Sequence, residues 1–294
     1  MHKSGFVNII GNPNVGKSTL MNALVGEKLS IITSKAQTTR HRILGIVNGD
    51  DFQIVFSDTP GILKPCYKLQ ESMMNFVRGA LSDADVLLYV TDTVERDDER
   101  AAEIIDRIRQ SGVPTPVVVN KIDLSTQEAL EALVEKWRAT LPDAEIIPIS
   151  AREGFNIAGL FDRILALLPE GEPFYPKDTL TDKTLRFFAS EIIREKILRN
   201  YDKEIPYSCE IEIEEYREEP GIDRISAVIY VARNSQKGIL IGHKGEKLKK
   251  VGRQAREELE EFLRKKVFLQ LFVKVSEDWR NDQRQLRRFG YDPQ

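Results

Sequence analysis

Eight residues near the N-terminus leave few choices for the fold around them: Gly11, Asn12, Pro13, Asn14, Val15, Gly16, Lys17 and Ser18. This pattern, G-x-x-x-x-G-K-[ST], predicts a strand, a glycine-rich loop and a helix, because backbone N–H groups of the loop and of the helix N-terminus bind phosphates. An apolar run at 6–10 and an amphipathic stretch at 17–25 supply that context. We expect Lys17 to contact the β- and γ-phosphates, Ser18 to bind Mg²⁺ and Thr19 to belong to the same site. An ordinary strand-to-helix turn is the weaker alternative.

Short apolar runs alternate with amphipathic stretches through the first 168 residues. We predict strands at 6–10, 43–47, 52–57, 86–91, 115–120 and 145–149, and helices at 17–25, 69–81, 99–110, 127–140 and 157–168. This alternation predicts an α/β fold with a mostly parallel sheet and helices on both faces. Only a short Asn48-Gly49 turn separates two of the strands, so we expect them to form an antiparallel hairpin at one edge.

A stretch rich in proline and glycine, from Pro169 to Pro176, ends the last of these helices. Beyond it, the predicted order is a helix, two strands, a glycine-containing turn, further helical residues and a strand. Their expected bounds are 182–200, 208–217, 224–232, 245–262 and 267–275. We therefore divide the chain into a first domain at 1–170, a linker at 171–179 and a smaller α+β domain at 180–294.

Asp58-Thr59-Pro60-Gly61 follows the third predicted strand. An aspartate here can hold Mg²⁺ through water, and the backbone N–H of Gly61 can meet a γ-phosphate. Ordinary turns often contain the same residue types, so the motif alone is weak evidence for a nucleotide site. Its position one strand away from the phosphate loop is what makes it informative.

Asn120-Lys121-Ile122-Asp123 follows the fifth predicted strand and indicates which base is bound. The Asp123 carboxylate can accept hydrogen bonds from N1–H and the N2 amine of guanine, whereas adenine has no such donor pair. Ser150-Ala151, after the sixth strand, fits a loop whose backbone N–H meets guanine O6. Four motifs in this order, each at the carboxyl end of a strand, predict a protein that binds GTP and GDP.

The second domain carries a G-x-x-G loop that is preceded by aliphatic residues and followed by a basic helix. K-homology (KH) domains hold the backbone of single-stranded RNA with such a loop, and the predicted order of elements is that of the bacterial, type II, KH domain. A helix-capping turn is the alternative. The expected RNA-binding residues are Ile239, Ile241, Gly242, His243, Lys244, Gly245, Lys247 and Lys250.

The net charge of −3 conceals an asymmetry, because residues 1–170 carry −5 and residues 237–294 carry +6. A basic end on an acidic chain favours a polyanionic partner, although charge runs are often only solvated helix faces. No apolar run approaches the roughly 18 residues that cross a bilayer. The N-terminus has no signal-peptide layout, and Cys66 and Cys209 have no metal-binding spacing. We therefore expect a cytoplasmic protein with two free thiols.

The four nucleotide motifs match the small GTPase superfamily, and the whole chain resembles the Era-like GTPases. The resemblance includes KAQTTRHR at 35–42, ASEIIREK at 189–196 and LRRFGY at 286–291. It implies a GTPase that binds 16S rRNA near its 3′ end and acts in assembly and maturation of the 30S ribosomal subunit. Some members associate peripherally with the cytoplasmic face of the inner membrane. We expect a monomer.

The resemblance also implies roles for residues at the γ-phosphate. It assigns Thr39, in the first switch between Gly26 and Arg42, as a Mg²⁺ ligand; Thr38 is the rival that the sequence leaves open. Ile62 stands where many signalling GTPases carry a glutamine that orients water, so we expect slow hydrolysis by the chain alone. In several relatives an asparagine at the position of Asn14 helps to bind a monovalent cation, here K⁺; a turn-favouring Asn is an equal alternative. The expected catalytic residues are Lys17, Asn14, Thr39 and Gly61.

Three rival classes remain. A pure RNA-binding protein with a structural nucleotide would show no multiple turnover. An assembly GTPase with two GTPase domains is disfavoured, because the chain has one phosphate loop and one Asn-Lys-x-Asp motif. A P-loop ATPase or kinase is disfavoured by Asp123.

Overall fold

The computed structural model describes residues 1–94 and 99–291, which form two compact units. Met1–Cys66 and Gln70–Asp182 make the first unit, and the second contains Tyr67–Leu69 and the described residues from Lys183 onward. The last residues of the predicted second domain, 292–294, lie outside the described residues. Each unit has its own sheet and its own hydrophobic core.

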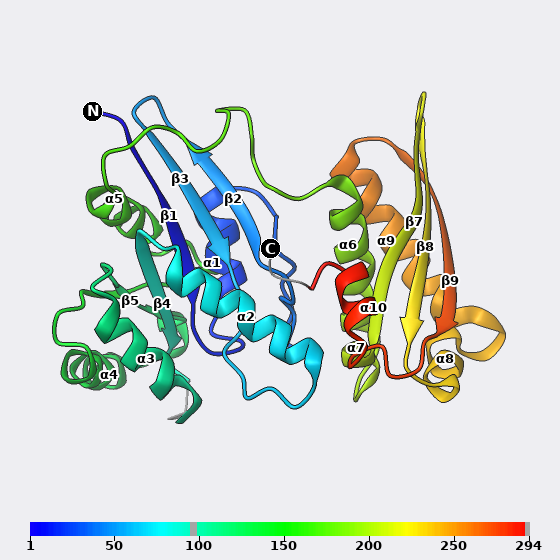
Figure 1. The fold of residues 1–294 in the computed structure, drawn as a ribbon, viewed down its shortest axis with the longest axis horizontal. Helices are drawn as coiled ribbons and strands as arrows, with labels where there is room; N and C mark the ends of the chain where they lie inside the picture. Colours follow the sequence, from blue (N-terminus) through cyan, green and yellow to red (C-terminus); the bar gives the residue numbers. More distant parts are fainter. Residues whose placement is uncertain (95–98, 292–294) are drawn as a thin grey trace. The chain divides into compact units, whose positions relative to one another are not determined.

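The first unit is built on a six-stranded sheet of order β2-β3-β1-β4-β5-β6 (Figure 1). The strands are β1 (Lys3–Ile10), β2 (Ile43–Asn48), β3 (Phe52–Asp58), β4 (Val86–Asp92), β5 (Val117–Asn120) and β6 (Ile146–Pro148). Every neighbouring pair is parallel except the β2–β3 hairpin, which is antiparallel and lies at the edge. The predicted fold class and its antiparallel edge are therefore confirmed. Strands β4 and β5 are buried along their whole length, as their unbroken apolar runs require.

Five α-helices cover the two faces of this sheet (Figure 1). They are α1 (Lys17–Val25), α2 (Lys68–Ser82), α3 (Glu99–Ser111), α4 (Gln127–Thr140) and α5 (Ile157–Leu167), with a short 3₁₀ turn η1 (Ile122–Leu124) after β5. Side chains of α2, α3 and α4, including Met74, Ile104 and Trp137, bury one face, and α1 and α5 cover the other. Because β1, β4, β5 and β6 run parallel, the loops after their carboxyl ends meet at one edge of the sheet.

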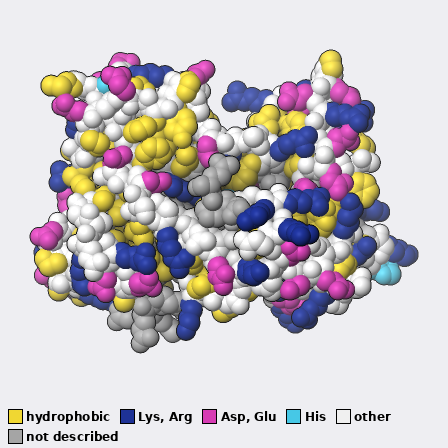
Figure 2. All heavy atoms as spheres, in the orientation of Figure 1, with side chains coloured by type: hydrophobic (Ala, Val, Ile, Leu, Met, Phe, Trp, Pro, Cys, Tyr) yellow, Lys and Arg dark blue, Asp and Glu magenta, His cyan; other side chains and the backbone are white. Residues whose placement is uncertain are grey.

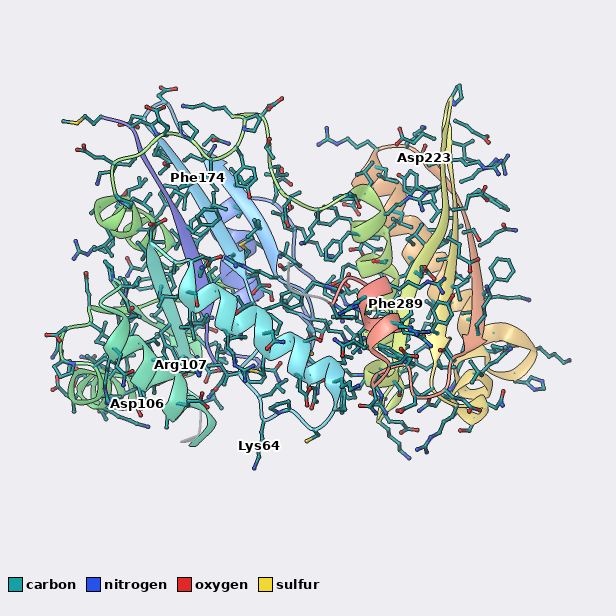
Figure 3. The ribbon with its side chains drawn as sticks, in the orientation of Figure 1. Lys64, Asp106, Arg107, Phe174, Asp223 and Phe289 are labelled. Atoms are coloured by element: carbon teal, nitrogen blue, oxygen red, sulfur yellow. The ribbon has the colours of Figure 1, made fainter. Side chains whose placement is uncertain are left out.

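The segment predicted as a linker packs along the first unit. The Gly171 N–H donates to the His2 carbonyl at 3.1 Å, and the Gln53 side chain accepts from the backbone of Phe174 and Tyr175. The Phe174 ring lies 4.9 Å from that of Phe6 (Figure 3). Contacts of this kind fix residues 171–182 to the strands of the first unit, which accordingly extends to Asp182.

The second unit has a three-stranded sheet of order β7-β8-β9, in which β8 is antiparallel to β7 and parallel to β9. Its elements are α6 (Leu185–Asn200), α7 (Ile205–Ser208), β7 (Cys209–Glu219), β8 (Ile222–Val231), α8 (Asn234–Ile241), η2 (His243–Gly245), α9 (Glu246–Leu263), β9 (Lys266–Val275) and α10 (Gln283–Arg288). The sequence predicted the order of the long elements, whereas α7, α8 and α10 were not anticipated. Helices α6, α8 and α9 bury one face of the sheet.

The C-terminal segment packs onto the second unit. Trp279 is fully buried and its indole N–H donates to the Ser208 carbonyl at 3.1 Å, while the Phe289 ring meets that of Trp279 edge to face (Figure 3). The Tyr291 hydroxyl donates to Glu210 at 2.6 Å. These contacts give the LRRFGY segment a structural role as the cover of one end of β7 and β8.

Candidate functional site

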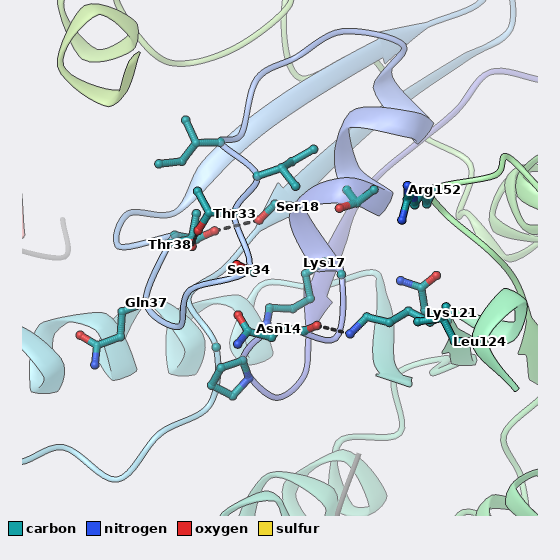
Figure 4. A pocket seen from close by; sticks show the side chains of 18 of the residues that line it. Asn14, Lys17, Ser18, Thr33, Ser34, Gln37, Thr38, Lys121, Leu124 and Arg152 are labelled. Carbon is teal, nitrogen blue, oxygen red and sulfur yellow. Dashed lines mark hydrogen bonds between the residues drawn. The ribbon is translucent and has the colours of Figure 1, made fainter. Parts of the chain in front are cut away.

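A cavity of about 450 Å³ lies where the loops after β1, β3, β5 and β6 meet (Figure 4). Residues that line it come from the phosphate loop, the first switch, the end of β3 and the loops after β5 and β6: Pro13, Asn14, Gly16, Lys17, Ser18, Thr19, Ile31, Ile32, Thr33, Ser34, Gln37, Thr38, Thr39, Gly61, Asn120, Lys121, Asp123, Leu124 and Arg152. The structure therefore brings the four motifs together around one space.

The three predicted Mg²⁺ ligands are in mutual contact at one end of this cavity. The Ser18 hydroxyl donates to Asp58 Oδ2 at 2.7 Å and lies 2.8 Å from the Thr39 hydroxyl. Asp58 is fully buried, and burial raises the pKa of its carboxyl, an effect opposed by the Lys17 ammonium and by the Ser18 and Thr39 hydroxyls. Within the described residues, its Oδ1 atom has no hydrogen-bond partner. A buried carboxylate oxygen and two hydroxyls are donors that suit Mg²⁺.

The geometry separates the two candidate threonines of the first switch. The Thr39 hydroxyl also donates to Asp58 at 3.3 Å, and the residue is only 8% exposed. The Thr38 hydroxyl instead donates to the Lys35 carbonyl at 2.6 Å and lies 2.6 Å from the Thr33 hydroxyl. The arrangement favours Thr39 at the metal and gives Thr38 a role in shaping the switch loop.

The phosphate loop holds Lys17 by its own backbone. The buried ammonium donates to the carbonyls of Gly11 and Asn12 at 3.0 and 2.8 Å, so it lies inside the turn of the loop. Gly16 precedes α1 with a φ of 96°, and a Cβ there would lie 2.2 Å from the Asn120 amide nitrogen. Only glycine combines that backbone conformation with so close a neighbour.

Asn120 joins three loops of the base-binding end. Its amide donates to the Val15 carbonyl at 2.9 Å and its oxygen accepts from the Ala151 N–H at 2.9 Å. The Ser150 hydroxyl donates to Asp123 Oδ1 at 2.6 Å, which orients that carboxylate toward the cavity. The Asn-Lys-x-Asp and Ser-Ala motifs thus support one another, as guanine recognition requires.

Asp92, at the end of β4, contacts a motif residue of the site, a contact that the sequence analysis missed. Its Oδ2 atom makes a short ion pair with the Lys121 ammonium, which also donates to the Asn14 carbonyl (Figure 4). The Thr93 hydroxyl donates to the Lys121 carbonyl at 3.1 Å. Lys121 therefore connects the phosphate loop to the base loop. The sequence could have suggested Asp92 as the acidic partner of Lys121, because Asp92 ends a strand of the same sheet.

The residue after the Asp-x-x-Gly motif faces away from the cavity. Ile62 is 2% exposed and belongs to the core beneath α2 and α3, while its backbone N–H donates to the Gly11 carbonyl at 3.2 Å. An aliphatic side chain in the core cannot orient water, which agrees with the expectation drawn from the sequence.

The cavity lining contains part of the predicted set of nucleotide-site residues. The following are not among the residues that line it: Gly11, Asn12, Val15, Asp58, Thr59, Pro60, Ser150 and Ala151. The buried Thr59 hydroxyl donates to the Ile9 carbonyl at 2.7 Å, so its side chain anchors the loop instead of facing a ligand. Conversely, Leu124 and Arg152 line the cavity and were not predicted; both adjoin motif residues.

The G-x-x-G loop forms a sharp bend between α8 and α9. Gly242 has a φ of 73°, Lys244 a φ of 49° and Gly245 a φ of 77°, so three of its four residues adopt conformations that side chains disfavour. A Cβ on Gly242 would lie 2.8 Å from the stem of Lys247. His243 and Lys244 are exposed at the tip, and Ile239 is exposed whereas its neighbour Leu240 is buried in the core.

A groove of about 390 Å³ begins at this loop and runs between α9 and β9. Its residues are Gly245, Leu248, Lys249, Gly252, Arg253, Arg256, Leu269 and Leu271. Apolar residues form its floor and three cations form its rim, a combination that suits bases and phosphates of a single strand. Of the eight predicted RNA-binding residues, Gly245 alone lines this groove, and Lys249, Arg253 and Arg256 line it in addition.

The fold and the two sites define a class of protein, a P-loop GTPase joined to a KH domain. Family models agree with both parts: "50S ribosome-binding GTPase" matches residues 6–121 and "KH domain" matches residues 204–280. Among curated proteins, GTPase Era of Syntrophus aciditrophicus is 46% identical over 99% of this chain and 96% of its own length, and GTPase Era of Alkaliphilus metalliredigens is 45% identical over 99% of both.

Two solved structures superimpose over the whole chain. A variant of Aquifex aeolicus Era bound to GDP·AlF₄⁻ has a TM-score of 0.95 and 43% identity, covering 99% of this chain and all of that one. A structure of Era in complex with MgGDPNP and nucleotides 1506–1542 of 16S ribosomal RNA has a TM-score of 0.96 and 42% identity, covering both chains completely. The protein belongs to the GTPase Era family, and it is a GTPase.

Proposed function

We propose that this GTPase binds the 3′ region of 16S rRNA through the KH groove and acts in assembly of the 30S ribosomal subunit, with GTP and Mg²⁺ in the cavity of the first unit. The observation that supports this proposal most strongly is that one chain contains both a guanine pocket with Asp123 and an apolar groove rimmed by Lys249, Arg253 and Arg256. The Era complex with MgGDPNP and 16S rRNA, similar over the full length, supports the pairing of these two ligands.

In this proposal, residues 1–170 are the GTPase domain, 171–179 the linker and 180–294 the RNA-binding domain. Ser18, Thr39 and Asp58 hold Mg²⁺, which neutralises charge on the phosphates. Lys17 contributes a positive charge from inside the phosphate loop. Gly61 approaches that loop so closely that a Cβ on it would lie 2.7 Å from Pro13 Cα, and in this proposal its N–H meets the γ-phosphate.

A monovalent cation completes the proposal at the phosphates. Asn14 lines the cavity with a φ of 65°, and its carbonyl is held by Lys121. In this proposal the Asn14 side-chain oxygen helps to bind K⁺ beside the phosphates. The cation would stabilise developing negative charge that Ile62 cannot influence.

Peripheral binding to the inner membrane stays a prediction of the resemblance. Among the described residues, no helix is both long and apolar enough to span a bilayer. Flotation of the protein with vesicles containing anionic lipid, with and without GTP, measures the association directly; protein that stays at the bottom of the gradient would contradict it.

The experiment that tests the proposed function is a filter-binding titration with a single-stranded fragment from the 3′ end of 16S rRNA. Gly242→Asp or Gly245→Asp should abolish most of the binding, because a side chain blocks the approach of the sugar-phosphate chain and a carboxylate repels it. Intrinsic GTP hydrolysis should stay unchanged. Lys244→Ala should mainly flatten the salt dependence, since one phosphate contact contributes a slope of roughly −0.7 for single strands.

Folding of the variants needs its own control, because Gly242 adopts a left-handed conformation. A thermal melting curve that matches that of the wild type would establish that a variant is folded. If a well-folded double glycine variant binds the fragment as tightly as the wild type, the loop is not the RNA site.

A further inference from the structure

Arg42 stands at the end of the first switch, and most of its side chain is buried in the first unit. Charged side chains of both signs are scattered over the face of the molecule that Figure 2 shows, whereas only 18% of the Arg42 side chain is exposed. A guanidinium group has five N–H donors, and a largely buried one needs acceptors for them. Hydrogen bonds to three side chains satisfy most of these donors.

The three acceptors come from different elements of the first unit. The Arg42 Nε–H donates to the Ser57 hydroxyl on β3 at 2.7 Å, and Nη2 donates to the Asn8 side-chain oxygen on β1 at 3.1 Å. Nη1 and Nη2 also donate to the two carboxylate oxygens of Asp83, which directly follows α2, at 2.6 and 3.0 Å. This bidentate pair gives the guanidinium one defined orientation. We call these four residues the Arg42 cluster.

The Arg42 cluster fastens the C-terminus of α2 to the sheet. Asn8 and Ser57 are fully buried neighbours on β1 and β3, and the Asn8 amide donates to the Ala80 carbonyl and to Asp83, each at 2.7 Å. Carbonyls in the last turn of a helix lack partners within the helix. The last turn of α2, all of it described, has no basic residue, so Arg42 brings from another element the positive charge that a helix C-terminus favours.

The cluster also adjoins two of the proposed Mg²⁺ ligands. Ser57 directly precedes Asp58 on β3, and successive side chains of a strand point to opposite faces of the sheet. Arg42 follows Thr39 by three residues, and the Thr39 hydroxyl donates to Asp58 at 3.3 Å. The bond from Arg42 to Ser57 on one face of the sheet therefore holds together the two segments whose ligands meet on the other.

Such an anchor matters when the loop has to become ordered. The first switch of a GTPase is ordered by contacts with the γ-phosphate and its Mg²⁺, and is released when the γ-phosphate is lost. Fixing the backbone of each residue costs conformational entropy, so an anchor near Thr39 lowers the cost of ordering this loop at the metal. GDP does not require that ordering, so the benefit applies to GTP.

We propose that Arg42 is a positioning residue for GTP hydrolysis, which holds the end of the first switch so that Thr39 reaches Mg²⁺ beside Asp58. Arg42 is not among the residues that line the cavity, so it acts through its neighbours and not by touching the nucleotide. This inference rests on the proposed metal site and extends it to a cluster on the opposite face of the sheet. It assigns to Arg42 a preference of the protein for GTP over GDP.

The test compares the affinities of the full chain for GDP and for a non-hydrolysable GTP analogue by calorimetry, with Mg²⁺ and with EDTA. With Mg²⁺, Arg42→Gln should weaken binding of the analogue about tenfold, the loss expected from one charge-assisted hydrogen bond, and GDP binding less than about twofold. In EDTA the ratio of the two affinities should equal that of the wild type. Arg78→Ala removes an exposed hydrogen bond to Asn75 on the same helix and is the matched control that should change neither affinity.

A second variant keeps the test decisive if Arg42→Gln does not fold. Ser57→Ala removes the acceptor on β3 and leaves the ion pair with Asp83, and it should weaken analogue binding about threefold in Mg²⁺ alone. In a folded double variant it should add nothing to Arg42→Gln, because both changes break the same bond. Additive losses, equal losses for GDP and the analogue, or losses that persist in EDTA would overturn the positioning role and leave the cluster as a support for α2.

Thr39→Ala separates this inference from the metal site on which it rests. If Thr39→Ala weakens analogue binding in Mg²⁺ and both folded cluster variants bind like the wild type, the metal site stands and the role of Arg42 is refuted. If Thr39→Ala leaves the Mg²⁺ dependence unchanged, the proposed metal site fails and this inference fails with it.

Discussion

Replacing Asp123 by Asn changes the base that the cavity prefers. The carboxylate is held by the Ser150 hydroxyl through Oδ1 and faces the cavity beside Leu124. Guanine donates two hydrogen bonds to it from N1–H and the N2 amine. In the variant, an amide N–H₂ meets one of those donors, so a charge-assisted bidentate pair is lost.

The cost can be worked out from that pair. Hydrogen bonds to charged groups contribute about 1.5–3 kcal/mol each, and one oxygen still accepts in the variant, so we expect a loss of about 3 kcal/mol for GTP. This corresponds to roughly a 150-fold weaker affinity. Xanthosine triphosphate carries an oxygen at C2 that accepts from the new amide, so its affinity should rise.

Calorimetric titration of both nucleotides against the wild type and Asp123→Asn measures the switch. Asp106→Asn makes the same chemical change in an exposed ion pair with Arg109 on α3, outside the residues that line the cavity, and should alter neither affinity (Figure 3). An unchanged preference for GTP in Asp123→Asn would refute the assignment of the base site.

The remaining predictions concern hydrolysis and coupling. Asn14→Ala should remove a stimulation of GTP hydrolysis by KCl over equal NaCl, because a cation at the phosphates stabilises developing charge; equal wild-type rates in the two salts would leave Asn14 as a turn residue. GTP should change the affinity for RNA, and RNA should change the affinity for GTP by the same factor, because linkage is reciprocal. Titrations of RNA against the GDP-bound protein and the protein bound to a non-hydrolysable GTP analogue test this, and identical affinities would mean two independent domains.

Much of the nucleotide site could be predicted from the sequence, because its chemistry depends on loops whose positions the sheet dictates. Gly16, Asp58 and Asn120 are far apart in the sequence, yet each follows a strand, and parallel strands bring their carboxyl ends to one edge. Alternating apolar and amphipathic segments were enough to place that edge. The fold class followed from the same alternation.

The parts that escaped prediction depend on long-range pairing. Lys121 fits its motif whether or not it has an acidic partner, and only the packing of β4 beside β5 brings Asp92 to its ammonium. Helix α8 is eight residues long and is followed directly by the G-x-x-G loop. The glycines in this region therefore predicted a turn, and the short helix was missed. Residues 171–182 looked like a linker because proline and glycine dominate local propensity, whereas their hydrogen bonds to Gln53 and His2 are tertiary.

Thr39 is the residue at which the structure goes furthest beyond the sequence. Its hydroxyl contacts Ser18 and Asp58, whereas that of Thr38 contacts Thr33 and the Lys35 backbone. Thr39→Ala should therefore lower single-turnover GTP hydrolysis about 10- to 100-fold, as expected when one interaction of a charged site is lost. The Mg²⁺ concentration that gives half-maximal hydrolysis should be higher for Thr39→Ala than for the wild type.

The two neighbouring threonines supply matched controls for this prediction. Thr39→Ser keeps the hydroxyl and should restore both the rate and the Mg²⁺ dependence, which separates ligation from packing of the methyl group. Thr38→Ala removes a contact within the switch loop and should change the rate less than about threefold, because no hydroxyl is lost at Asp58. If Thr38→Ala raises the Mg²⁺ requirement and Thr39→Ala does not, the first switch must reverse which of its two threonines faces Asp58 when nucleotide binds, and the assignment from the observed hydrogen bonds is wrong.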